Sequence, residues 1–186
     1  ILLPTLMCRL LTLPSLRYRV VPGLSEISSA LVPRLLSHAG EVVCLVDGDS
    51  GGIKIARRLA KHGIPSDRVL SLKQIANNAT VEDLVTATLL ADAIRAEVAS
   101  WGGTIELDDG DIPEFGRWAW FKKAYPDIED SLNKNRVAGR MADAVRNCAS
   151  TSDAIPTQLH ESLTQLHEQV MTLLHADNAS PTVTDV

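Results

Sequence analysis

Two aspartates, Asp47 and Asp49, are the residues of this sequence best suited to chemistry, because they follow an apolar run and are separated only by Gly48. Glycine adopts backbone angles closed to other residues, so we expect a turn that brings both carboxylates toward one spot. Paired oxygen ligands without a nearby cysteine or a usefully spaced histidine suit Mg²⁺ or Mn²⁺ rather than Zn²⁺. Two adjacent carboxylates also repel each other unless a cation or a proton lies between them. The sequence therefore predicts a divalent-metal site, and the alternative is a solvent-exposed Asp-Gly turn with Ser50 capping the next helix.

The segments around this turn predict an α/β fold. Residues 42–46 form an uninterrupted apolar run, which is typical of a strand covered on both faces. Further strands are expected at residues 17–21 and 68–72, and helices at residues 25–38 and 53–62. This alternation indicates a parallel sheet with right-handed crossovers and helices on both faces. In open parallel sheets ligands bind at the carboxyl ends of the strands, which is where the acidic turn lies.

The second half of the sequence is predicted to be helical. Thr80 is expected to cap a helix that continues to about residue 100, and further helices are expected at residues 130–148 and 157–175. Trp118 and Trp120 are expected to lie on a short helix, where they either pack against the fold or stack on unpaired bases. We expect residues 1–150 to form one domain, and residues 151–186 an amphipathic helix with a frayed tail.

Composition and charge bound the class of protein. With 186 residues, 45% of them hydrophobic and 22% charged, the chain can build a core and is not an intrinsically disordered protein. The net charge of −5 excludes a surface that attracts polyanions everywhere, so nucleic-acid binding would need local basic patches or bound metal. Three widely spaced cysteines imply no disulfide framework, and no segment suits a bilayer span or a signal peptide. We therefore expect a cytoplasmic protein. The sequence opens inside an apolar helical pattern without a cap, so we also expect native sequence upstream.

Two motifs in this sequence resemble a known family. The strand at 42–46, the letters DGDSGG at 47–52 and the helix carrying Lys54 resemble the DxD motif of Toprim domains, found in topoisomerases, bacterial primases, recombination mediators and OLD-family (overcoming lysogenization defect) nucleases. The letters TVEDL at 80–84 resemble the TxEDL segment of the OLD-family nucleases. The resemblance is best over residues 22–84. It implies a Toprim-like (Rossmann-like) parallel sheet flanked by helices, with a C-terminal helical extension.

The resemblance also implies which acids bind metal. Asp47 and Asp49 would hold a divalent ion, Glu82 would supply a further ligand, and Asp83 is a second candidate. OLD-family nucleases use two metal ions, which activate a water and stabilise the leaving oxygen during phosphodiester cleavage. The alternative for Glu82 and Asp83 is a helical first turn in which carboxylates favour the helix dipole. Family members also carry a Glu-Gly motif on the first strand; no such pair precedes the acidic turn here, so we expect this chain to be inactive in isolation.

Basic residues are candidates for contacts with the nucleic acid. The resemblance implies that Lys134 helps to neutralise the phosphate, with Arg136 and Arg140 as alternatives that would also contact DNA. Lys54 and Arg57, on the helix that follows the acidic turn, are further candidates for DNA contacts. The alternative for all five residues is a solvated helix face.

The resemblance predicts partners as well. OLD-family proteins usually carry an ABC-type ATPase domain before the Toprim part, and no Walker A loop is present in this sequence, so ATP use would belong to an upstream region. The expected substrate is DNA, the expected activity is that of a metal-dependent endonuclease, and the full protein is a candidate homodimer.

Two other classes of protein fit the acidic turn. A haloacid-dehalogenase-like phosphatase also places DxD after an apolar strand, with the first aspartate as nucleophile. That family expects Thr or Val two residues after the second aspartate, where this sequence has Gly51, and its motif usually opens the fold. The third reading is a non-catalytic Toprim-like module that binds a partner through its last helix.

Overall fold

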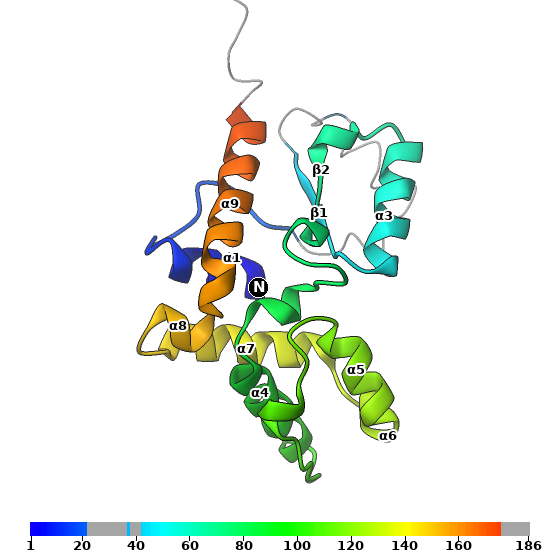
Figure 1. Ribbon diagram of the computed structural model, residues 1–186, viewed down its shortest axis with the longest axis vertical. Coiled ribbons are helices and arrows are strands. Elements are labelled where there is room, and N and C mark those ends of the chain that lie inside the picture. The colour runs from blue at the N-terminus through cyan, green and yellow to red at the C-terminus, as the bar shows by residue number, and fades with distance from the viewer. Residues whose placement is uncertain (22–36, 38–41, 176–186) are drawn as a thin grey trace, which may run out of the picture.

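A small parallel sheet lies beside a larger group of helices in the computed structural model, which describes residues 1–21, 37 and 42–175 (Figure 1). The fold is mixed α/β with helices dominant. The expected helix at 25–38, apart from Ser37, and the expected tail at 176–186 lie outside the described residues. Within the described residues, no helix is long and apolar enough to cross a membrane.

The sheet consists of two parallel strands joined by a helix. Strand β1 (Cys44–Val46) pairs with β2 (Val69–Ser71), and helix α3 (Ser50–Lys61) lies between them in sequence. Cys44, Val46 and Leu59 are buried in a small core between this helix and the sheet. A 3₁₀ turn, Ser66–Arg68, leads into β2, and another, Leu72–Gln74, follows it. The predicted parallel pair and its connecting helix are thus confirmed.

The expected strand at residues 17–21 is wrong. The segment has no strand geometry, and Val21 is 74% exposed. Tyr18 instead packs against helix α9 (His160–His175), where its hydroxyl lies 3.1 Å from Nδ1 of His167. The valines of this segment favour a strand, but a strand also needs a neighbouring strand with which to form hydrogen bonds. Within the described residues the sheet therefore has two strands rather than the broader sheet expected.

The remaining described residues are mainly helical. The α-helices are α1 (Leu2–Leu10), α4 (Ala87–Ala99), α5 (Arg117–Ala124), α6 (Pro126–Glu129), α7 (Lys134–Asn147) and α8 (Thr151–Ala154). The 3₁₀ turns are η5 (Val81–Leu84), η6 (Asp109–Asp111) and η7 (Thr157–Leu159). The single helix expected from Thr80 to about residue 100 is divided in two. The helix is interrupted because the backbone of Val85 is extended. Hydrogen bonds to distant residues hold this break: Val85 O accepts a hydrogen bond from Arg117 Nη1, and Thr86 N donates one to Ala154 O.

Helices α1, α4, α7 and α9 share one large hydrophobic core. Leu6, Ile94, Met141, Leu163 and Leu166 are all fully or almost fully buried in it. The last helix, expected to be an extension beyond residue 150, therefore buries its apolar stripe in the same core as the first helix. This core holds α7, whose first residue, Lys134, points toward the acidic turn.

The glycines after the acidic turn differ sharply in the space around them. A Cβ on Gly52 would overlap the carbonyl oxygen of Asp47, whereas a Cβ on Gly51 would meet only the Asp49 carboxyl group, 3.2 Å away. We expect Gly52→Ala to lower the free energy of unfolding by about 1–3 kcal/mol, the usual cost of overpacking. Gly51→Ala should change it by less than about 1 kcal/mol, the scale of a helix-propensity change. Urea unfolding of both variants checks this pair, and equal effects would contradict the close packing of the turn.

Candidate metal centre

Backbone hydrogen bonds join the acidic turn to the loop that follows β2. Gly48 N donates to Ala79 O at 2.6 Å, and Asn78 N donates to Gly48 O at 3.2 Å. The carboxyl ends of the two parallel strands therefore lie together. This pairing places Asp47 beside residues 80–82, although more than thirty positions separate them in sequence.

Gly48 is required for a reason other than the one the sequence suggested. Its φ lies outside the left-handed region, so unusual backbone angles are not what the turn needs. A Cβ on Gly48 would lie 2.7 Å from the backbone nitrogen of Lys73. Glycine is needed because the segment after β2 passes too closely for a side chain.

Asp47 occupies the electrostatic centre of the site. Its side chain is half-buried, and the backbone N–H of Val81 donates a hydrogen bond to it. Burial raises the pKa of Asp47 to about 6, and repulsion from Glu82 and Asp49 contributes to this rise. The charge of Lys134 and the Val81 hydrogen bond act in the opposite direction. The structure thus brings Asp49, Glu82 and Lys134 within electrostatic range of Asp47.

Asp49 also caps helix α3. Its Oδ1 accepts a hydrogen bond of 2.7 Å from Gly52 N, so the helix cap is Asp49 rather than Ser50. A carboxylate at this position also interacts favourably with the helix dipole. The cap uses one of the two carboxylate oxygens, and a cation can still bind the other.

Glu82 forms an ion pair with Lys134 from the start of α7. The Lys134 Nζ lies 3.4 Å from Glu82 Oε1, and the side chains are 46% and 15% exposed respectively. The same ammonium lies 4.6 Å from the centroid of the Trp118 ring. No local pattern signals the contact with Trp118, because that residue lies on α5, sixteen positions before the lysine.

Asp83 has a structural role. It is fully buried, and its Oδ2 accepts hydrogen bonds from Thr80 N at 2.7 Å, Thr80 Oγ1 at 3.2 Å and Gly116 N at 3.0 Å. Its Oδ1 accepts from Arg117 N at 3.0 Å. Four hydrogen bonds satisfy this carboxylate, so its oxygens are occupied within the fold. Of the two neighbouring acids at 82–83, Glu82 faces the Asp47 site and Asp83 anchors the loop.

The candidate DNA-binding arginines of α7 are engaged elsewhere. Arg136 Nε lies 3.1 Å from Oε1 of Glu97, and Arg140 Nε lies 3.0 Å from its Oε2. Glu97 is only 2% exposed, so both arginines neutralise a buried carboxylate of α4. Two positions along a helix correspond to a rotation of about 200°, which places Arg136 on the side opposite Lys134.

Lys54 and Arg57 lie on the exposed face of α3, the helix that begins just after Asp49. Exposed lysine and arginine side chains can contact phosphate groups, although such a face is also typical of an ordinary solvated helix.

The donor set fits a hard divalent cation. Asp47, Asp49 and Glu82 offer oxygen ligands only, and the Lys134 ammonium pairs with Glu82 and lies within electrostatic range of Asp47. Across residues 1–21, 37 and 42–175, however, no three His, Cys, Asp or Glu side chains are grouped closely enough to hold an ion together. Mg²⁺ commonly binds one or two carboxylates and keeps several waters, so Asp47 and Asp49 are sufficient as its protein ligands.

Comparison with family models, curated proteins and solved structures found no match to this chain. The resemblance to Toprim domains therefore stays an expectation based on two short motifs. The function has to be inferred from the site itself.

The raised pKa of Asp47 predicts a pH-dependent effect of Asp47→Asn. Between about pH 4 and pH 6 the folded protein binds a proton that the unfolded chain has released, so rising pH destabilises the fold. Asparagine removes this penalty. We expect the variant to exceed wild type in stability by about 1 kcal/mol at pH 7, after allowance for partial exposure, and by less at pH 4. Urea unfolding at both pH values, without divalent metal, measures the difference. A pH-independent difference would contradict the electrostatic account.

Asp83→Asn should destabilise the fold far more than Glu82→Gln. The amide NH₂ of asparagine would face N–H donors in place of one acceptor oxygen, at a position with no access to water. We expect a loss of about 2–4 kcal/mol. Glu82→Gln removes only a partly exposed ion pair, worth about 1 kcal/mol or less. Thermal and urea unfolding of the two variants make the comparison, and similar losses would refute the anchoring role of Asp83.

Proposed function

We propose that this chain is the divalent-metal-binding part of a DNA endonuclease that hydrolyses phosphodiester bonds, with a Toprim-like arrangement of its sheet. The observation that carries the proposal is the gathering of Asp49, Glu82 and Lys134 around Asp47, whose pKa is raised to about 6 by burial and by repulsion from Glu82 and Asp49. A carboxylate whose pKa is strongly perturbed by burial and by neighbouring charges is characteristic of a functional site. The parallel β1–α3–β2 unit, with the acids at the carboxyl end of β1, supports the Toprim-like arrangement.

Asp47 and Asp49 are the proposed ligands of Mg²⁺ or Mn²⁺. A bound ion of this kind supplies Lewis-acid chemistry, which lowers the pKa of a coordinated water and stabilises a leaving oxygen. Two ions are expected from the resemblance, and Glu82 is the further carboxylate that a second ion would use. Asp83 is left out of the proposed ligand set because its oxygens accept four hydrogen bonds.

Lys134 is the proposed phosphate-neutralising residue. Its ammonium lies next to the acidic cluster, and its side chain is 46% exposed, so a phosphate at the surface can reach it. Lys54 and Arg57 on α3 are proposed to contact flanking phosphates, which hold DNA in place without reading its sequence. Arg136 and Arg140 are better explained by their pairing with Glu97. The upstream ATPase domain and the homodimer remain predictions from the resemblance.

Asp47→Ala and Asp49→Ala should each abolish metal-dependent nicking. Each substitution removes a proposed ligand, and loss of a ligand in a two-carboxylate site leaves too little affinity for catalysis at millimolar metal. The measurement is conversion of supercoiled plasmid to the nicked form with Mg²⁺ or Mn²⁺, by the chain within its native sequence context. We expect a loss of at least about a hundredfold, the scale seen when one catalytic electrostatic group is removed.

Asp67→Ala is the matched control, because Asp67 is an exposed aspartate in the 3₁₀ turn that leads into β2. It therefore lies at the end of the parallel sheet opposite to Asp47 and Asp49. It should retain full nicking activity. Retained nicking by Asp47→Ala would refute the assignment. Capture of beryllofluoride on Asp47, which mimics a phosphoaspartate, would favour a phosphatase instead.

A further inference from the structure

Trp118 supports the one ammonium group of the acidic cluster. The Lys134 Nζ lies 4.6 Å from the centroid of the Trp118 ring and 3.4 Å from Glu82 Oε1. The lysine therefore has an aromatic face on one side and a carboxylate on the other. Each contact alone is weak for a half-exposed lysine, but together they favour a single position of the ammonium.

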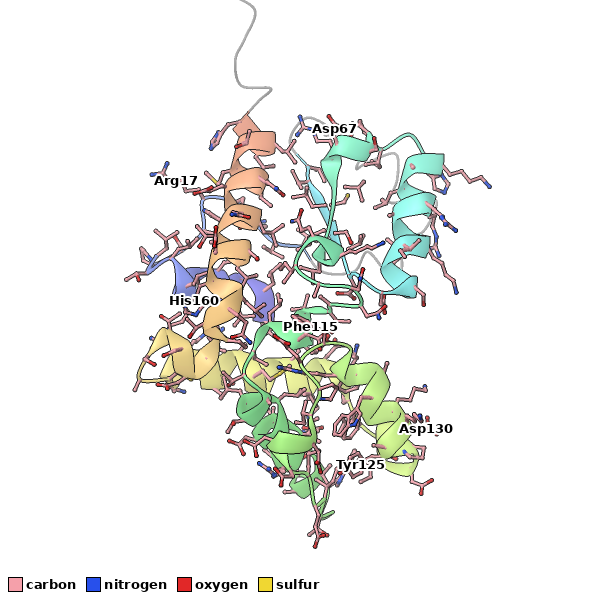
Figure 2. All side chains as sticks on the ribbon, viewed as in Figure 1. Arg17, Asp67, Phe115, Tyr125, Asp130 and His160 are labelled. Carbon is pink, nitrogen blue, oxygen red and sulfur yellow. The ribbon has the colours of Figure 1, made fainter. Side chains whose placement is uncertain are left out.

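Helix α5 holds Trp118 in a fixed place. Its N-terminus is anchored by Asp83, which accepts hydrogen bonds from Gly116 N and Arg117 N. The Arg117 guanidinium, 3% exposed, donates to Pro113 O and Val85 O. Figure 2 marks the two ends of this helix by Phe115, just before it, and Tyr125, just after it. With its first turn bonded to the Asp83 loop, the helix presents Trp118 as a rigid surface.

The ring packing below Trp118 supports the same conclusion. Its ring centroid lies 5.7 Å from that of Phe121, which is 1% exposed and in turn stacks on Tyr125 at 5.2 Å. Aromatic pairs at such distances add stability beyond the area that they bury. A side chain packed against a buried neighbour has little freedom to follow the lysine if the lysine moves.

The position of the ammonium decides what Glu82 can do. Glu82 repels Asp47 electrostatically, so it lies near enough to influence an ion bound there. Its Oε1 is paired with Lys134, and no cluster of three metal-binding side chains is formed in the part of the chain that the structure describes. While Glu82 is paired with Lys134, its Oε1 is engaged by the ammonium and is less available to an ion at Asp47.

We propose that Trp118 is a positioning residue that holds Lys134 against Glu82 and thereby weakens binding of a divalent ion at Asp47 and Asp49. The inference rests on the proposed metal site. It acts in two ways, because the fixed ammonium repels the incoming cation and also occupies the remaining carboxylate. A lysine released from the ring spends more of its time in water, so both effects weaken.

A double-mutant cycle on Mn²⁺ affinity tests this role. Calorimetric titration of the 186-residue chain with Mn²⁺ alone, compared for wild type, Trp118→Leu, Lys134→Met and the double variant, isolates the coupling between ring and ammonium. We expect Trp118→Leu to tighten Mn²⁺ binding by about two- to fivefold, the range of an exposed cation–π contact. Lys134→Met should tighten it at least as much. In the Lys134→Met background, Trp118→Leu should have no further effect.

Matched variants separate positioning from packing. Trp120→Leu makes the same change on the same helix, but its ring faces Tyr125 at 6.1 Å, so Mn²⁺ affinity should stay at the wild-type value. Trp118→Phe keeps an aromatic face and should restore most of the wild-type affinity. Circular dichroism checks the fold, and Trp118→Met, which also removes the ring, replaces Trp118→Leu if that variant does not fold.

The outcomes distinguish the two proposals. An equal effect of Trp118→Leu with and without Lys134, or no effect at all, overturns the role of Trp118. Absence of Mn²⁺ binding by wild type, or binding that survives Asp47→Asn together with Asp49→Asn, overturns the proposed metal site and the inference with it. Tightening that depends on Lys134 and is reversed by Trp118→Phe supports both.

Discussion

The buried carboxylate of Asp83 is the interaction on which the candidate site depends. An ionised group without access to water costs several kcal/mol unless hydrogen bonds replace the lost hydration, and Asp83 receives bonds from Thr80, Gly116 and Arg117. Those donors belong to two segments more than thirty positions apart. The same interaction therefore closes the loop that carries Glu82 and fixes the start of the helix that carries Trp118. The buried Arg117 guanidinium balances its charge, since Asp83 opposes the lowering of the Arg117 pKa that burial causes.

The acidic turn shows the opposite electrostatic situation. Burial and nearby negative charge disfavour ionisation of Asp47, and the single ammonium of Lys134 offsets only part of that repulsion. A fold gains no stability from such an arrangement, whereas a bound divalent ion would turn repulsion into attraction. Two neighbouring acids, Glu82 and Asp83, thus have different roles. Asp83 is satisfied by hydrogen bonds within the fold and stabilises it, whereas Glu82 is partly exposed and pairs with Lys134 beside the acidic turn.

The basic residues of helix α7 have two different roles, one in the packing of the helices and one at the candidate site. Arg136 and Arg140 neutralise the buried Glu97 and so join α7 to α4, whereas Lys134, on the other side, reaches the acidic cluster. The first of these contacts fixes the rotation of the helix about its own axis. The second follows from that rotation, because a helix turned by even one position would carry the lysine away from Glu82. The ion pairs of Arg136 and Arg140 with Glu97 therefore determine where the Lys134 ammonium lies at the candidate site.

The sequence by itself determined the elements whose signals are local. The apolar run before Asp47 and the periodic apolar faces of α3, α7 and α9 predicted the parallel pair and these helices, because strand and helix periodicity depends on a few neighbouring residues. Only the tertiary structure decided what depends on distant partners. The segment at 17–21 does not pair with a strand. Gly48 is necessary because the backbone of Lys73 passes too close for a side chain. The Asp83 carboxylate accepts four hydrogen bonds. Trp118 contacts Lys134 because the core brings α5 and α7 together, and no local sequence pattern predicts this contact.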